Sequence, residues 1–196
     1  MNIFYLHSDP YKAAAYHYDK HKVKMILEAA QMLCTAHRMY NLDDECQDIP
    51  YKKAHVNHPS TIWARQSGQN YYWLYHYMIA LGGEYTKRYN KTHLTITKCE
   101  KPLAKYPGGI LHTGFTEPPQ CMPDEYKVPG NSVKAYWNYY INDKKTIINK
   151  NEKPYTEYPF DVDNIYGTAR ANFFSKNIEG HGNYIPRYHQ TNRQHT

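Results

Sequence analysis

The segment that decides the fold is residues 19–33, which read Asp-Lys-His-Lys-Val-Lys-Met-Ile-Leu-Glu-Ala-Ala-Gln-Met-Leu. Apolar residues recur there at steps of three and four, the period of an α-helix with one buried face. Upstream, Asp9 precedes Pro10, and a capping acid before a proline is typical of a helix start. We predict a helix from Pro10 to about Tyr40, with a kink near Asp19. The residues expected to face the core are Val23, Ile26, Ala30, Leu33 and His37.

Further helix signals follow along the chain. His58 and Pro59 begin a second helix, Ser67 and the glycine after it interrupt that helix, and a third runs to about Arg88. Its stripe of Tyr71, Leu74, Met78, Leu81 and Tyr85 has helical spacing, and the Gly82–Gly83 pair indicates close packing against another backbone. Ser132 is expected to cap a last helix that ends near residue 145.

The remaining segments carry turn and loop signals. Residues 93–131 contain six prolines together with several glycines and buried-type apolar residues, so we expect a long ordered loop. Residues 151–196 are polar and lack periodicity. The predicted fold is therefore all-α, a compact bundle of about four to five helices in one domain, residues 1–150. An irregular C-terminal arm, residues 151–196, packs on that domain or is used for binding.

Composition points to nucleic acid. The chain has 22 tyrosines in 196 residues and a net charge of +6. Tyrosine with lysine and arginine suits surfaces that contact nucleotides, although the same rings also fill helical cores. Residues 61–110 hold seven basic groups against two acidic ones, and a solvated basic face is the alternative reading. The seven are Arg65, Lys87, Arg88, Lys91, Lys98, Lys101 and Lys105.

Other function classes receive no support from the sequence. No apolar run is long enough to span a membrane, and the first residues lack the basic flank of a signal peptide, so we expect a cytoplasmic protein without a membrane partner. The four cysteines lack CxxC spacing and are expected to be free thiols. Glycine-rich phosphate loops are absent, and we predict no cofactor.

Residues 16–28 are the densest group of side chains suited to chemistry. Glu28 lies four residues after Lys24 on a helix, so a carboxylate and an amine share one face. A partly buried Glu28 could stabilise an oxocarbenium-like sugar, and a desolvated Lys24 could form a Schiff base. The alternative is an ordinary solvated ion pair. His17, His21, His55 and His58 could hold a metal, but no carboxylate or cysteine completes a zinc spacing, and we predict no metal site.

Three segments in the same order resemble the pyrimidine-dimer DNA glycosylase superfamily, of the endonuclease V type. They are residues 23–33 (VKMILEAAQML), 57–63 (NHPSTIW) and 84–89 (EYTKRY), so the resemblance covers about residues 1–91. The segments at residues 19–21 and 118–127 are also similar to uncharacterised bacteriophage proteins. The resemblance implies an all-α enzyme that cleaves a glycosidic bond in DNA through an imine, with Glu28 matching the family's helical glutamate and Lys24 its lysine. The family's endonuclease V type uses an N-terminal amine as nucleophile. The amine that Asn2 would carry after removal of Met1 is therefore the second candidate nucleophile, after Lys24.

We therefore expect a phage-type DNA-acting enzyme that processes an N-glycosidic bond of a damaged or modified base. The alternatives are a nucleotide- or base-modifying transferase or hydrolase of phage DNA hypermodification, and a non-enzymatic module that binds nucleic acid or a host protein. The sequence gives no oligomeric state. The candidate catalytic residues are Glu28, Lys24, Asp19, His21 and His58. The candidate nucleic-acid contacts are Lys20, His55, Arg65, Lys87, Arg88, Lys91, Tyr72 and Trp73.

Overall fold

The computed structural model describes residues 1–41 and 46–163, and within them the chain forms helices and no strands. This confirms the predicted all-α class. None of the described helices is long and apolar enough to cross a membrane. The helices are α1 (Pro10–Ala15), α2 (Asp19–Tyr40), α3 (Pro59–Ala64), α4 (Gly68–Tyr89), α5 (Leu94–Cys99) and α6 (Ser132–Asn142), with 3₁₀ turns η2 (Asp124–Tyr126) and η3 (Lys144–Ile147).

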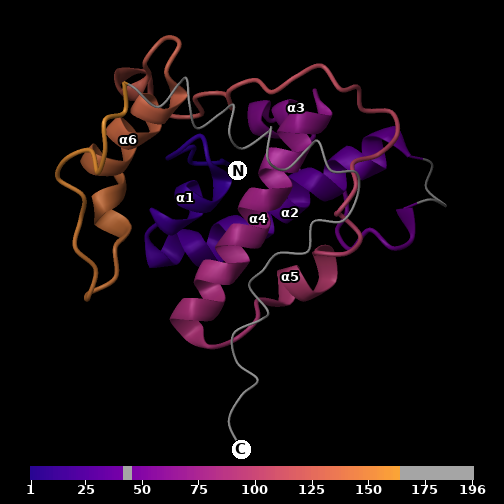
Figure 1. Ribbon diagram of the computed structural model, residues 1–196, viewed down its shortest axis with the longest axis horizontal. Helices are drawn as coiled ribbons and strands as arrows, with labels where there is room; N and C mark the ends of the chain where they lie inside the picture. The colour runs from indigo at the N-terminus through magenta and orange to yellow at the C-terminus, as the bar shows by residue number, and fades with distance from the viewer. Residues whose placement is uncertain (42–45, 164–196) are drawn as a thin grey trace, which may run out of the picture.

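The two long helices, α2 and α4, pack against each other, and α1 packs on α4 (Figure 1). The predicted stripe of α4 is confirmed at four of its five positions, because Tyr71, Leu74, Met78 and Leu81 are fully buried, whereas Tyr85 is half-buried. The glycine pair of α4 packs closely at one position only, and there against a side chain instead of the predicted backbone. A Cβ on Gly82 would lie 2.6 Å from Cγ1 of Ile96 in α5, whereas a Cβ on Gly83 would meet nothing within 4 Å.

The N-terminal segment, residues 1–8, runs through the middle of the helices (Figure 1). Residues 3–6 are buried although they form no helix, so their backbone needs partners from elsewhere. Trp137 Nε1 donates to the carbonyl of Leu6 at 2.8 Å, and Trp73 Nε1 donates to the carbonyl of Ser8 at 2.7 Å. Indole groups of α4 and α6 thus fix this segment in place.

The single helix predicted from Pro10 to Tyr40 is wrong in one respect. The chain breaks after Ala15 and restarts at Asp19, instead of kinking. Tyr18, the N-cap of α2, makes no capping hydrogen bond with its side chain, and a carboxylate oxygen of Glu152 instead accepts from the Asp19 N–H at 2.7 Å. A residue far along the chain therefore satisfies one of the free donors at this helix start.

The region after α4 also differs from prediction. The expected loop contains α5, whose first turn is capped by the His93 ring, and Asn131 rather than Ser132 caps α6. Of the predicted arm, residues 151–163 lie against the helices, where Tyr155 donates through its hydroxyl to the carbonyl of Tyr16 at 3.2 Å. Residues 164–196, which hold the rest of that arm, lie outside the described part of the chain.

Candidate active site

A glutamate on α2 brings two amines together. The Glu28 side chain is only 12% exposed, and its Oε2 accepts the backbone N–H of Asn2 at 2.9 Å. The α-ammonium of Met1 lies 3.8 Å from the same oxygen, and Nζ of Lys24 lies 3.2 Å from Oε1. The predicted pairing of Lys24 with Glu28 is present, and the start of the chain joins it.

The N-terminal residues are held by contacts on several sides. Asn2 donates from Nδ2 to the carbonyl of Cys121 at 2.9 Å, and its Oδ1 accepts from the Tyr136 hydroxyl at 2.8 Å. The buried Met1 side chain receives a hydrogen bond on Sδ from Thr61 at 3.5 Å. Chain ends are usually mobile unless they are tied down. These contacts fix the α-amine beside Glu28.

His58 adjoins this group from the start of α3. Its Nδ1 accepts the N–H of Ser60 at 3.2 Å and so caps the helix. Burial, followed by the charges of the Met1 ammonium and His55, lowers the pKa of His58, while Glu28 opposes that shift. The ring is therefore neutral at pH 7, and because Nδ1 accepts, the proton sits on Nε2.

Lys24 agrees with the ion-pair alternative and not with the desolvated nucleophile. Its side chain is 72% exposed, so the lysine is solvated rather than desolvated. Asp19 is also placed away from Glu28, nine residues earlier on α2, which is about 14 Å along the axis. Its carboxylate accepts from Nε of Arg88 at 2.7 Å. Asp19 and Arg88 thus form an ion pair at the beginning of α2, remote from the two amines.

Two of the predicted site residues belong to the core. Trp73 is fully buried, and a buried ring cannot stack on a nucleotide, so its assignment as a nucleic-acid contact is corrected. His21 is buried too, with its ring stacked on Phe4 at a centroid distance of 4.3 Å and its Nδ1 bonded to the Tyr140 hydroxyl. Burial, with the charges of Lys144 and Lys24, lowers the pKa of His21 to about 3.

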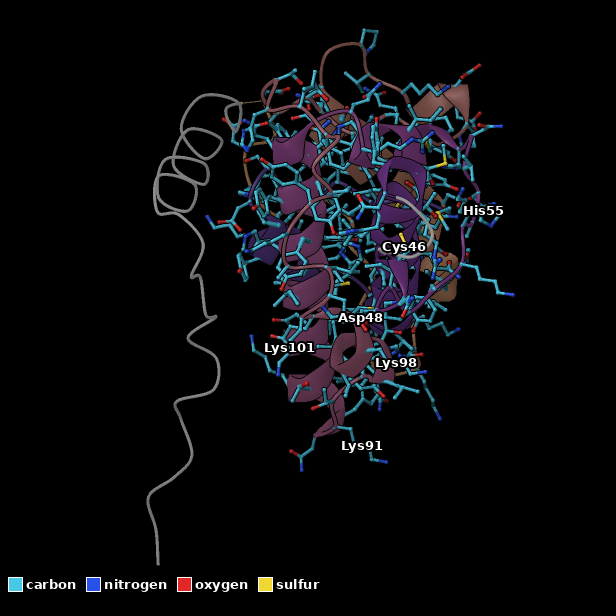
Figure 2. All side chains as sticks on the ribbon, turned by 90° about the vertical axis from the view of Figure 1, so that its right-hand side faces the viewer. Cys46, Asp48, His55, Lys91, Lys98 and Lys101 are labelled. Atoms are coloured by element: carbon cyan, nitrogen blue, oxygen red, sulfur yellow. The ribbon has the colours of Figure 1, made fainter. Side chains whose placement is uncertain are left out.

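The other predicted nucleic-acid contacts are spread over the surface. Lys20 and Lys91 are exposed, and Tyr72 is half-buried against Tyr106. Lys87 pairs with Glu84 at 2.7 Å. Figure 2 shows Lys91, Lys98 and Lys101 at one end of the molecule, with His55 well apart from them. Arg65 donates to the carbonyl of Val56 at 2.9 Å and so lies on the side of His55.

The four histidines considered as metal ligands are not brought together. His17 bonds through Nδ1 to the carbonyl of Ala13 and through Nε2 to Tyr77 inside the core, whereas His55 is exposed. Over residues 1–41 and 46–163, no three His, Cys, Asp or Glu side chains are grouped to hold an ion.

Several residues of the site carried no sequence signal. The N-terminal amine was predicted at Asn2 and not at Met1, and Tyr136 and Cys121 contact Asn2 across 134 and 119 residues of chain. Cys121 lies in the segment 118–127 and Tyr136 in the last predicted helix, but no motif or helical spacing connects either residue to the N-terminus. Only the tertiary fold reveals these contacts.

Residues 1–97 match the family model described as pyrimidine dimer DNA glycosylase, and this part of the chain belongs to that family. The match confirms the resemblance seen over about residues 1–91. It includes Met1, Lys24, Glu28 and His58, whereas Cys121 and Tyr136 lie beyond it. No curated protein and no solved structure matches the chain.

Proposed function

We propose that the protein is a DNA glycosylase with lyase activity, which removes a damaged or modified base through an imine formed at the sugar C1′. The observation that carries the proposal is the contact of one half-buried carboxylate, Glu28, with the α-ammonium of Met1 and with Lys24. The family of residues 1–97 supports a DNA substrate that contains a damaged pyrimidine.

The reaction requires an amine that can lose a proton. A neutral amine attacks C1′, a C–N bond forms, and the glycosidic bond breaks with its electron pair leaving on the base, which takes up a proton. Transfer of one proton from the attached nitrogen to O4′, with opening of the C1′–O4′ bond, then gives the protonated imine and a free O4′ hydroxyl. Glu28 is placed to accept the ammonium proton and to stabilise the positive charge that develops on the sugar.

Met1 is the better placed of the two amines. Its side chain is 2% exposed and held by Thr61, whereas Lys24 is on a solvated four-carbon stem. α-Amino groups as a class are weaker bases than lysine side chains, so a larger fraction is neutral near pH 7. If Met1 is removed, the amine passes to Asn2, whose nitrogen is 2.9 Å from the same Glu28 oxygen.

Borohydride trapping tests the proposal. Wild type, Lys24→Ala and Glu28→Gln are incubated with duplexes that contain an abasic site, a pyrimidine dimer or a modified thymine, and the adduct is mapped by mass spectrometry, which also gives the first residue of the intact chain. We expect an adduct on the N-terminal peptide that survives in Lys24→Ala, and a rate about 100-fold lower in Glu28→Gln. Lys150→Ala, an exposed lysine after α6, is the control and should behave as wild type.

The other outcomes are equally clear. An adduct lost in Lys24→Ala and mapped to residue 24 assigns the nucleophile to the lysine. Absence of any adduct with folded wild-type protein on all three DNAs overturns the glycosylase–lyase proposal.

A further inference from the structure

The loop between α2 and α3 presents positive charge beside the candidate site. Lys52, Lys53 and His55 are all exposed on it. Within the described residues, neither lysine has an acidic partner within ion-pair distance. By contrast, Lys87 and Arg88 on α4 are both paired with carboxylates. Free cations on a surface are available to an anionic ligand.

Hydrogen bonds to α2 and α3 brace the loop along its length. Arg38 donates from Nε to the carbonyl of Tyr51 at 2.7 Å. The Thr35 hydroxyl accepts from the Ala54 N–H at 3.0 Å and lies 3.3 Å from its carbonyl oxygen. Further along, Arg65 of α3 binds the carbonyl of Val56. The two lysines are therefore carried on an ordered backbone, which reduces the entropy lost when they bind a ligand.

His55 has a left-handed backbone. Its φ is +47°, in a region that only a few per cent of non-glycine residues adopt, with asparagine, aspartate and histidine the most frequent among them. The N–H of His58 bonds to the His55 carbonyl at 2.9 Å and holds the turn. Strained positions of this kind concentrate at ligand-binding segments. Figure 2 shows the His55 side chain at the edge of the molecule, directed to solvent.

The loop lies on the same side of α2 as Glu28. Thr35, which binds Ala54, is seven residues from Glu28, and residues seven apart share a helix face about 10 Å from each other. On the α3 side, His58 ends the loop, and Thr61 one turn later contacts Met1. Lys52 and Lys53 thus come one or two residues before Ala54, which contacts α2, and six or seven residues before Pro59, the first residue of α3.

We infer that Lys52 and Lys53 bind backbone phosphates of the DNA strand next to the target nucleotide. The inference rests on the proposed function, because it names the part of the substrate that this edge of the site holds. Phosphate pairing of this kind fixes the register of a duplex and adds affinity without reading sequence. It also helps to offset the cost of extracting a base from the stack.

The salt dependence of DNA binding tests the inference. Anisotropy titrations between 50 and 200 mM salt would use a labelled duplex with an uncleavable abasic analogue. Each phosphate contact contributes about 0.9 to the slope of log K against log salt, so Lys52→Ala/Lys53→Ala should lower its magnitude by about 1.8. The matched control is Lys150→Ala/Lys153→Ala, two exposed lysines in the segment after α6, on the opposite side of the molecule in Figure 1.

Two further measurements distinguish a failure of the phosphate site from a failure of the proposed function. His55→Gly accommodates the left-handed φ, so this variant should keep the wild-type melting temperature. Trapping at subsaturating enzyme should be slower in Lys52→Ala/Lys53→Ala than in Lys150→Ala/Lys153→Ala, because the two loop lysines act in binding. An unchanged slope in a folded Lys52→Ala/Lys53→Ala protein, or an equal fall in the control, overturns the phosphate site. Loss of trapping in wild type overturns the proposed function instead.

Discussion

Tyr136→Phe is the substitution whose consequences follow most directly from the structure. The ring is fully buried, and its hydroxyl lies 2.8 Å from Oδ1 of Asn2 and 2.8 Å from the carbonyl of Pro119. The N–H of Cys121 donates to the same hydroxyl at 3.3 Å. A phenol has one proton, so it donates to one of the two oxygens and accepts from Cys121.

Removing this oxygen has two energetic effects. The donated hydrogen bond, worth about 1 kcal/mol net, is lost, and the Cys121 N–H loses one of its two acceptors but keeps the Pro119 carbonyl at 3.0 Å. The free energy of unfolding should therefore fall by about 1–2 kcal/mol. For a chain of this size each kcal/mol shifts the melting temperature by about 2–4 °C, so the expected decrease is about 2–8 °C. Asn2 also loses a contact that positions Met1, so trapping on abasic DNA should slow.

Thermal unfolding followed by circular dichroism measures the first effect, and single-turnover trapping measures the second. Tyr158→Phe is the control, because its exposed hydroxyl makes a surface hydrogen bond to Asn138 and its loss should change stability by less than about 0.5 kcal/mol. If Tyr136→Phe melts within about 1 °C of wild type, the hydroxyl does not hold the N-terminus as described and the reasoning is refuted.

Two further predictions concern α4 and the buried histidines. Gly82→Ala places a Cβ 2.6 Å from Ile96 and should lower the urea midpoint of unfolding. Gly83→Ala meets no neighbour and should raise the free energy of unfolding by about 1 kcal/mol through helix propensity. Equal effects of the two substitutions would contradict the close packing at Gly82. Burial lowers the pKa of His37 to about 4 and that of His21 to about 3 from 6.5. The unfolded chain then binds more protons than the native one, so the free energy of unfolding should fall as pH drops from about 6.5 towards 4, and urea titrations at pH 7.5 and 5 that agree would contradict this.

The long helices could be predicted because their information is local. Repeated apolar spacing specifies α2 and α4, and Pro59 and Ser67 mark helix starts that need no distant partner. A kink near Asp19 was predicted, but a full break could not be, since the acceptor of the Asp19 N–H is Glu152, 133 residues away. The six-residue α5 is too short for periodicity to reveal, and a histidine ring is not among the usual caps.

The candidate site, like the helices, was predictable only where the information is local. Helical spacing alone places Lys24 beside Glu28, and that pairing is present. Helical spacing does not show which residue next to a buried stripe is itself buried. Tyr72 and Trp73, which follow Tyr71 of the α4 stripe, were therefore both predicted as nucleic-acid contacts. The fold separates them, with Tyr72 half-buried and Trp73 wholly in the core. The placement of Met1 depends on contacts that no local pattern encodes.

Residues beyond 97 therefore contribute to the candidate site, although the family match that suggests its chemistry ends at residue 97. Within residues 1–97, Glu28 and Lys24 require only α2. The position of the α-amine requires more, because Cys121 and Tyr136 hold Asn2 and Trp137 holds the buried carbonyl of Leu6. Without those partners, buried polar groups of the N-terminal segment would lose their hydrogen bonds, and a backbone without helix or strand could not stay in the core. The amine would then sample solvent, and Glu28 would keep only Lys24.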